Sequence, residues 1–367
     1  MNDTRLSTPP NVAKIEFTDV DSTLEAEFGP RVREYRRAYR ESLNYARSPS
    51  VPDFPITVSL ELVNRCNLSC VMCYTVNHSR KKEAFSTEQI ARIFSECAKY
   101  GLPALQIAGG GEPLVYKQAD EVMRLARRAD ILDIFLCTNG VLLDERLCDF
   151  VIEERIARVV VSLDAATPET YRKIRGKDEL ALIEENVRRL IAVRNARGSR
   201  LPLVRVSFCI QPDNLHERQA FLEKWNGVVD YVDFQEMQDA VHVDEVKEKG
   251  FDAGVFKSLK APEEVYCYYP FSMLSIWSNG DVSPCCSWYA KNLIVGNVHQ
   301  TSLKEIWDGP EVAEVRQQIL NGQLNPSCHA CLAQRDTDSF EKAKHTINAV
   351  SAAQASAGKA SAQGDVE

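Results

Sequence analysis

The sequence predicts an α/β fold: a partial (β/α)6 TIM-like barrel followed by a small Cys-rich C-terminal domain. From about residue 56, short apolar runs alternate six times with amphipathic stretches, as in βαβ units on a parallel sheet. The 367 residues suffice for one large and one small domain. Most of the twelve cysteines lie in two groups, one after the first predicted strand and one near the C-terminus. The repeats alone would also fit a doubly wound sheet.

Apolar, β-branched runs identify the six strands, and the 3.6-residue periodicity of charge identifies the helices between them. Ser86 is the predicted N-cap of the first of these helices. The strands are expected at residues 56–63, 103–109, 132–138, 157–163, 203–210 and 229–237, and the helices at 86–100, 117–129, 142–154, 181–197 and 217–227.

Shifts in composition divide the chain into five parts. The N-terminal extension, residues 1–55, is expected to hold one charged helix at 25–48, and the barrel core spans 56–236. A charged stretch without core pattern, 237–262, reads as a linker, and the Cys-rich domain spans 263–336. The Ala/Ser/Gly-rich tail, 337–367, is predicted to be disordered.

The charge and the termini limit the kinds of partner. A net charge of −8 and a pI near 5.5 argue against nucleic acid or an anionic membrane as a partner. No apolar run has the length of a membrane span, and the polar start "MNDTRLSTPP" is no signal peptide. We therefore expect a cytoplasmic protein, in which thiols stay reduced and clustered cysteines indicate metal or redox chemistry.

Special residues follow four successive predicted strands. The first strand leads into Cys66, Cys70 and Cys73, and the next three end in "AGGGEP" (108–113), "CTNG" (137–140) and "SLDAATPETYRKIRG" (162–176). Because the carboxyl ends of parallel strands meet at one edge, these segments should form one composite site.

The three-cysteine loop is the strongest local signal. A structural zinc site normally has four ligands in two separated pairs, whereas this loop has three cysteines within eight positions. A cubane iron–sulfur cluster held by three cysteines keeps one iron open for another ligand. The loop therefore predicts such a cluster with an exchangeable ligand.

These motifs resemble the radical S-adenosylmethionine (SAM) superfamily over residues 56–236. The resemblance implies that Cys66, Cys70 and Cys73 bind a [4Fe–4S] cluster whose open iron is chelated by SAM. It also implies reductive cleavage of SAM to a 5′-deoxyadenosyl radical, with an electron from a flavodoxin- or ferredoxin-type donor. Residues expected to line the SAM site by this resemblance are Tyr74, Gly110, Gly111, Glu112, Thr138, Asn139, Ser162, Asp164 and Arg175.

The second cysteine group resembles the SPASM/twitch extension of this superfamily. It has the pattern Cys267-x17-Cys285 followed by Cys328-x2-Cys331, and no cysteine occurs after Cys331. The resemblance implies the shorter, twitch-type form with one auxiliary [4Fe–4S] cluster, ligated by these four residues and serving electron transfer. Cys286 is an alternative ligand to Cys285, and a zinc ribbon is an alternative to the cluster.

The resemblance leaves the substrate open. Because residues 1–55 look too short for a winged-helix leader-peptide binder, we expect a small polar, sugar-like substrate that is oxidised, dehydrogenated or epimerised. The alternatives are a maturase of a ribosomally made peptide and a non-catalytic metal-binding interaction protein. No motif selects a general base, and the candidates are Arg205, Gln235 and Glu236.

Overall fold

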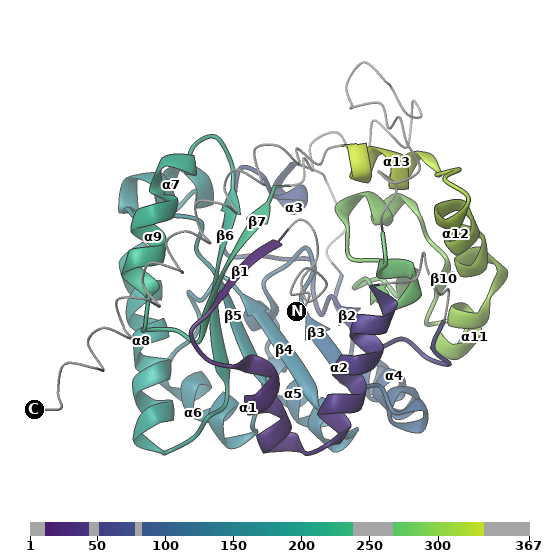
Figure 1. Ribbon diagram of the computed structural model, residues 1–367, viewed down its shortest axis with the longest axis horizontal. Helices are drawn as coiled ribbons and strands as arrows, with labels where there is room; N and C mark the ends of the chain where they lie inside the picture. The colour runs from purple at the N-terminus through teal and green to yellow at the C-terminus, as the bar shows by residue number, and fades with distance from the viewer. Residues whose placement is uncertain (1–11, 44–50, 78–82, 238–266, 334–367) are drawn as a thin grey trace, which may run out of the picture.

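The computed structural model describes residues 12–43, 51–77, 83–237 and 267–333. Its centre is one sheet with the strand order β1-β7-β6-β5-β4-β3-β2-β8-β9-β10. The six predicted strands run parallel to one another in sequence order, which confirms the α/β fold (Figure 1). They are β2 (Thr57–Leu60), β3 (Ala104–Ile107), β4 (Asp133–Thr138), β5 (Arg158–Ser162), β6 (Leu203–Ile210) and β7 (Tyr231–Glu236).

Amphipathic helices connect the parallel strands. Ser86 caps the first of them through a capping box with Gln89, as predicted. Buried aliphatic and aromatic side chains of helices and strands form one continuous core. The helices are α4 (Thr87–Tyr100), α5 (Ala119–Arg128), α6 (Glu145–Glu153), α7 (Pro168–Arg175), α8 (Leu180–Ala196) and α9 (Arg218–Trp225), with short helical turns α3 (Tyr74–Asn77), η2 (Pro113–Val115) and η3 (Leu215–Glu217).

The N-terminal extension differs from the prediction of one helix at 25–48. It contains β1 (Val12–Glu16), α1 (Val20–Phe28) and α2 (Arg31–Ser42), and β1 pairs antiparallel with β7. The predicted helix is broken because Gly29 adopts a left-handed φ of +81° and is followed by Pro30. Tyr35 of α2 packs on the start of the sheet, so α2 lies across the open side of the barrel (Figure 1).

The C-terminal segment continues the sheet. Strand β8 (Met273–Ile276) pairs parallel with β2, so the Cys-rich domain shares a strand edge with the barrel. The remaining elements are η5 (Tyr269–Phe271), β9 (Asp281–Ser283), η6 (Trp288–Asn292), β10 (Gly296–Asn297), α11 (Leu303–Asp308), α12 (Pro310–Leu320) and α13 (Pro326–Ala333).

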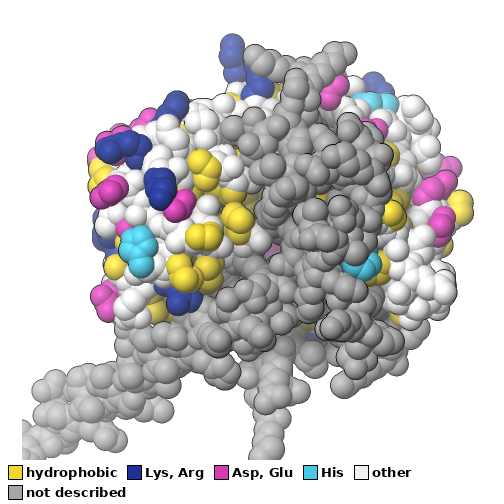
Figure 2. Space-filling model, turned by 90° about the horizontal axis from the view of Figure 1, so that it is seen from above, with side chains coloured by type: hydrophobic (Ala, Val, Ile, Leu, Met, Phe, Trp, Pro, Cys, Tyr) yellow, Lys and Arg dark blue, Asp and Glu magenta, His cyan; other side chains and the backbone are white. Residues whose placement is uncertain are grey.

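Two predicted segments, the linker beyond residue 237 and the tail 337–367, lie outside the described residues. On the face seen in Figure 2, described side chains of both charge signs are interspersed with apolar ones. Within the described ranges, no helix combines the length and the apolar character needed to cross a membrane.

Candidate active site

The loop after β2 carries Cys66, Cys70 and Cys73. The backbone N–H of Leu68 donates to Sγ of Cys66 at 3.4 Å, and Nη1 of Arg175 lies 3.6 Å from Sγ of Cys70. Burial raises the pKa of the Cys66 and Cys70 thiols. Bound iron would reverse this shift, because a coordinated thiol is deprotonated.

Two glycines let the neighbouring strand ends approach this loop. A Cβ on Gly111 would lie 2.0 Å from the carbonyl oxygen of Val63, and one on Gly176 would lie 2.3 Å from Oγ of Ser69. Gly176 also has a φ of +77° and ends α7. The run of glycines and the Arg-Gly pair are therefore required by backbone packing around the cysteine loop.

Glu112 connects the ends of β3 and β4. It is 3% exposed and accepts hydrogen bonds from the Thr138 hydroxyl and the Asn139 N–H, both at 2.7 Å. Burial raises the pKa of its carboxyl group, and the hydrogen bonds oppose that shift. The Asn139 amide donates to Oδ1 of Asn67 at 2.7 Å and lies 3.8 Å from Sγ of Cys66. Glu112, Thr138 and Asn139 thus form one hydrogen-bonded group that supports the cysteine loop.

Asp164 and Arg175 form a buried ion pair on the other side of the loop. Oδ2 of Asp164 lies 2.5 Å from Nη2 of Arg175, and Oδ1 accepts from the Cys209 N–H at 2.8 Å. Asp164 has a φ of +63°, a rare conformation that Asp tolerates better than most residues. Burial raises its pKa, which the charge of Arg175 counteracts. Arg175 therefore contacts Cys70 as well as Asp164.

The structure brings most of the predicted SAM-site residues to one edge of the sheet. Gly110 and Gly111 follow β3, and Ser162 ends β5 and is half-buried. Tyr74 is buried and its ring stacks on Trp288 of the C-terminal domain, with centroids 5.5 Å apart. That these residues contact SAM stays a prediction.

The C-terminal cysteines also converge. Burial, reinforced by the neighbouring Cys267, raises the pKa of Cys285 well above its usual value, and Cys286, Cys331 and Cys328 act on it in the same direction. Burial raises the pKa of Cys286 and of Cys328 to about 12 in each case. Cys285 thus lies within electrostatic reach of the four other thiols of this group.

The donors at both cysteine groups are thiols. Thiolates are the ligands that iron–sulfur clusters require, so the residues present fit such clusters. Zinc accepts thiolate ligands as well.

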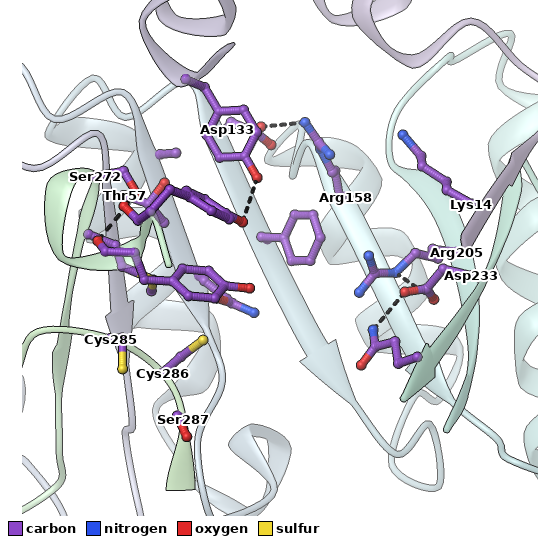
Figure 3. Close-up of a pocket in the computed structure, with 18 of the residues that line it drawn as sticks. Lys14, Thr57, Asp133, Arg158, Arg205, Asp233, Ser272, Cys285, Cys286 and Ser287 are labelled. Carbon is purple, nitrogen blue, oxygen red and sulfur yellow. Dashed lines mark hydrogen bonds and ion pairs between the residues drawn. The ribbon is translucent and has the colours of Figure 1, made fainter. Parts of the chain in front are cut away.

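A cavity of about 470 Å³ lies between the barrel and the C-terminal cysteines. Figure 3 shows Cys285 and Cys286 on one side of it and Lys14, Arg205 and Asp233 across from them. Met72, beside Cys73 in the loop, and Gln235 also line it. Of the three general-base candidates, Arg205 and Gln235 therefore face this cavity, and the side chain of Glu236 lies outside the described part of the chain.

Two ion pairs project into the cavity. Nη2 of Arg158 lies 2.6 Å from Oδ2 of Asp133, which also accepts from the Tyr35 hydroxyl at 3.0 Å. Nε of Arg205 lies 3.3 Å from Oδ1 of Asp233. The other carboxylate oxygen of Asp133 and Nε of Arg158 have no hydrogen-bond partner among the described residues, whereas Nε of Arg205 and Oδ1 of Asp233 have only their ion-pair contact with each other. Buried polar atoms in this state favour a polar ligand.

Most of these charged residues were not predicted as site residues. The available signal was their position: Asp133, Arg158 and Asp233 interrupt otherwise apolar strands in which both faces should be buried. A charge in such a strand must be paired or must face a polar cavity.

The fold and the two thiol sets define an iron–sulfur protein built on a partial α/β barrel. Residues 60–224 match the family model of the radical SAM superfamily, and residues 267–332 match the iron-sulfur cluster-binding domain SPASM. Together these matches cover more than half of the chain. The chain belongs to the radical SAM superfamily and carries a SPASM-type C-terminal domain. Its cofactors are a [4Fe–4S] cluster, SAM and an auxiliary iron–sulfur cluster.

Several curated relatives share one name. The chain is 33% identical over 138 residues to a probable GTP 3′,8-cyclase of Methanocaldococcus jannaschii, covering 37% of this chain and 46% of the relative. It is 29% identical over 179 residues to a probable GTP 3′,8-cyclase of Methanococcus vannielii, covering 48% and 57%. The chain thus spans about half the length of the curated relatives it matches.

Two solved structures show the same fold. Streptococcus suis SuiB aligns with a TM-score of 0.53 at 16% identity, covering 78% of this chain and 73% of that one. Native anSMEcpe with bound AdoMet aligns with a TM-score of 0.53 at 15% identity, covering 72% of this chain and 84% of that one.

The prediction of a sugar-like substrate that is oxidised or epimerised is wrong, since the curated relatives are named for a cyclisation of GTP. It rested on the N-terminal length alone and took no account of the charges in the cavity.

Proposed function

We propose that this protein is a radical SAM enzyme that acts on a nucleotide held in the cavity between the barrel and the auxiliary cysteines. The observation that carries the proposal is the charged cavity wall, where Oδ1 of Asp133 and Nε of Arg158 are buried and have no hydrogen-bond partner in the described part of the chain. A volume of about 470 Å³ is in the usual range for a small-molecule site. The names of the relatives support a purine nucleotide in particular.

The charge balance of the cavity suits an anionic ligand. Lys14, Arg158 and Arg205 line it with the acids Asp133 and Asp233 (Figure 3), and Arg36 lines it as well. Lys14 and Arg36 also pair with Glu16 and Asp21, which are not part of the lining. Arginine binds phosphate through two parallel N–H groups, and such charge-assisted hydrogen bonds are about twice as strong as neutral ones. A nucleotide phosphate at this wall would leave the base or ribose free to face the cysteine loop.

The chain's own residues orient and shield the reacting groups. When bound, the SAM-site cluster and SAM together supply a radical that removes a hydrogen atom from the substrate. Arg175 and Asn139 hold the loop that carries Cys66 and Cys70, and Met72 presents an apolar side chain to the cavity. We propose that Cys66, Cys70 and Cys73 hold the SAM-binding cluster and that Cys267, Cys285, Cys328 and Cys331 hold the auxiliary one.

Finer statements on the enzyme remain proposals. We propose that the auxiliary cluster exchanges one electron with the reacting centre, as an oxidoreductase would, and that a flavodoxin or ferredoxin reduces the SAM-site cluster. We also propose a cytoplasmic location, because none of the twelve cysteines, all of which lie in the described part of the chain, forms a disulfide there. We keep the division at 1–55, 56–236, 237–262, 263–336 and 337–367 as the proposed domain plan.

The test is an anaerobic assay of the reconstituted protein with SAM and dithionite. GTP, ATP or another nucleotide should raise 5′-deoxyadenosine formation at least tenfold. When the ribose of the nucleotide carries deuterium, that deuterium should appear in the 5′-deoxyadenosine. Arg205→Met should weaken nucleotide binding about 10- to 150-fold, because it removes a charged contact worth about 1.5–3 kcal/mol. Arg128→Met, which removes an exposed arginine paired with Glu121, is the matched control.

The proposal fails if no nucleotide stimulates SAM cleavage at full cluster occupancy. If a peptide stimulates SAM cleavage and nucleotides do not, the protein modifies a peptide. Equal nucleotide affinity in Arg205→Met and Arg128→Met would show that the charged wall is not the binding surface.

A further inference from the structure

Glu61 joins the glycine motif to the auxiliary domain. It follows β2 and is 2% exposed. Its Oε2 accepts from the Gly110 N–H at 2.6 Å, and its Oε1 accepts from the Ser278 hydroxyl at 2.8 Å and from the Ser278 N–H at 3.3 Å. Gly110 belongs to the motif after β3, whereas Ser278 follows β8 in the Cys-rich domain. One carboxylate thus holds two segments that are far apart in sequence.

Lys291 completes this contact from the auxiliary domain. Its side chain is 7% exposed, and Nζ lies 3.6 Å from Oε2 of Glu61. Nζ also lies 3.4 Å from the ring centroid of Trp277, 5.3 Å from that of Tyr74 and 5.4 Å from that of Trp288. A buried ammonium group is tolerated when a carboxylate and aromatic faces surround it. Tyr74 comes from the SAM-cluster loop, and both tryptophans come from the C-terminal domain.

We propose that Glu61 and Lys291 are positioning residues that couple SAM binding at the glycine motif to the auxiliary-cluster domain. The segment after β3 packs directly on the Glu61 side chain: a Cβ on Gly109 would lie only 2.6 Å from Cβ of Glu61. If the Lys291 ammonium group moves, the distance between its charge and the Glu61 carboxylate changes. The same carboxylate accepts the hydrogen bond of the Gly110 N–H and so fixes the orientation of that peptide group. The coupling holds for any substrate, and it rests on the prediction that Gly110 and Gly111 line the SAM site.

Lys291→Met tests the coupling from the auxiliary domain, because it keeps the aliphatic stem and removes the charge beside Glu61 and the Tyr74 ring. The readouts are the Kd of SAM by equilibrium dialysis and the change that SAM causes in the electron paramagnetic resonance spectrum of the reduced, reconstituted protein. We expect the Kd to rise about tenfold, and Lys291→Arg to restore it to within about threefold of the wild type. Lys304→Met is the matched control: it removes a lysine of the same domain that pairs with Asp308.

Two outcomes overturn the coupling. One is a Kd for Lys291→Met within about twofold of the wild type at full iron content. If Lys291→Met does not load iron, Ser278→Ala replaces it, since it deletes only one hydroxyl donor to Glu61. An unchanged Kd of SAM in Ser278→Ala then overturns the coupling, and a rise of about threefold in that Kd supports it. Normal SAM binding by Gly111→Ala would place SAM elsewhere and remove the basis of the coupling.

Discussion

Replacement of Arg175 by methionine should destabilise the barrel and disturb the SAM-site cluster together. The guanidinium group lies 2.5 Å from the Asp164 carboxylate, and the two side chains are 9% and 2% exposed. It also lies 3.6 Å from Sγ of Cys70. Methionine preserves most of the volume and removes both polar contacts, so the effect reports on charge and not on a cavity.

The size of the effect follows from the burial of the pair. Removing one partner of a buried ion pair costs about 3–5 kcal/mol, because the other charge stays buried. Unfolding entropy is about 2.1 cal/mol/K per residue, or roughly 0.6 kcal/mol/K for about 300 folded residues. The melting temperature should therefore fall by about 5–8 °C. Burial already raises the pKa of Asp164, and loss of Arg175 should raise it further.

Calorimetry of the anaerobic holoprotein measures the shift, with Arg172→Met as the control. Arg172 lies on the same helix and pairs with Asp178, but the two side chains are 58% and 56% exposed, so its loss should cost about 0–1 kcal/mol. Asp164→Asn combined with Arg175→Met should recover part of the lost stability, since no charge is left buried. Equal melting temperatures for the two single arginine variants would refute the reasoning.

Three further outcomes follow from the cysteine sites. Cys285→Ser should lower the iron content from about eight to about four per chain, whereas Cys286→Ser should keep about eight; equal iron in both would contradict the ligand assignment. In the apoprotein, burial raises the pKa of Cys286 and Cys328 to about 12, so the folded state keeps protons that the unfolded state releases. Stability of the apoprotein should therefore fall as the pH rises from about 9 towards 12, and a flat profile in urea titrations would argue against this burial. Gly176→Ala should reduce cluster loading at least fivefold, because its Cβ would lie 2.3 Å from Oγ of Ser69; normal iron content in that variant would show that the loop can shift.

The parallel sheet and the cysteine loop could be predicted because their signals are local. Apolar runs of β-branched residues define each strand, and Cys66, Cys70 and Cys73 lie within eight positions. The N-terminal strand could not be predicted in the same way. Five residues, Val12–Glu16, are too few for a pattern, and their strand conformation depends on pairing with β7, more than two hundred positions later.

The charged cavity and Glu61 were missed for a related reason. A sequence pattern shows that Asp133 and Arg158 interrupt apolar strands, but not that they pair with each other across β4 and β5. Glu61 read as part of a strand end, and its partner Ser278 is 217 positions away. Polar residues of this kind have roles set by contacts that only the folded chain creates.

The pairing of β8 with β2 shows that the barrel and the auxiliary domain share one sheet. Two domains joined only by a linker could move independently. Here Thr57–Leu60 pair with β3 on one side and with β8 on the other, so the strand that leads into the SAM-cluster loop is held by the auxiliary domain. Removing that domain would expose β2 as an edge strand directly before Cys66. The auxiliary domain is therefore part of the scaffold that positions the loop carrying Cys66, Cys70 and Cys73.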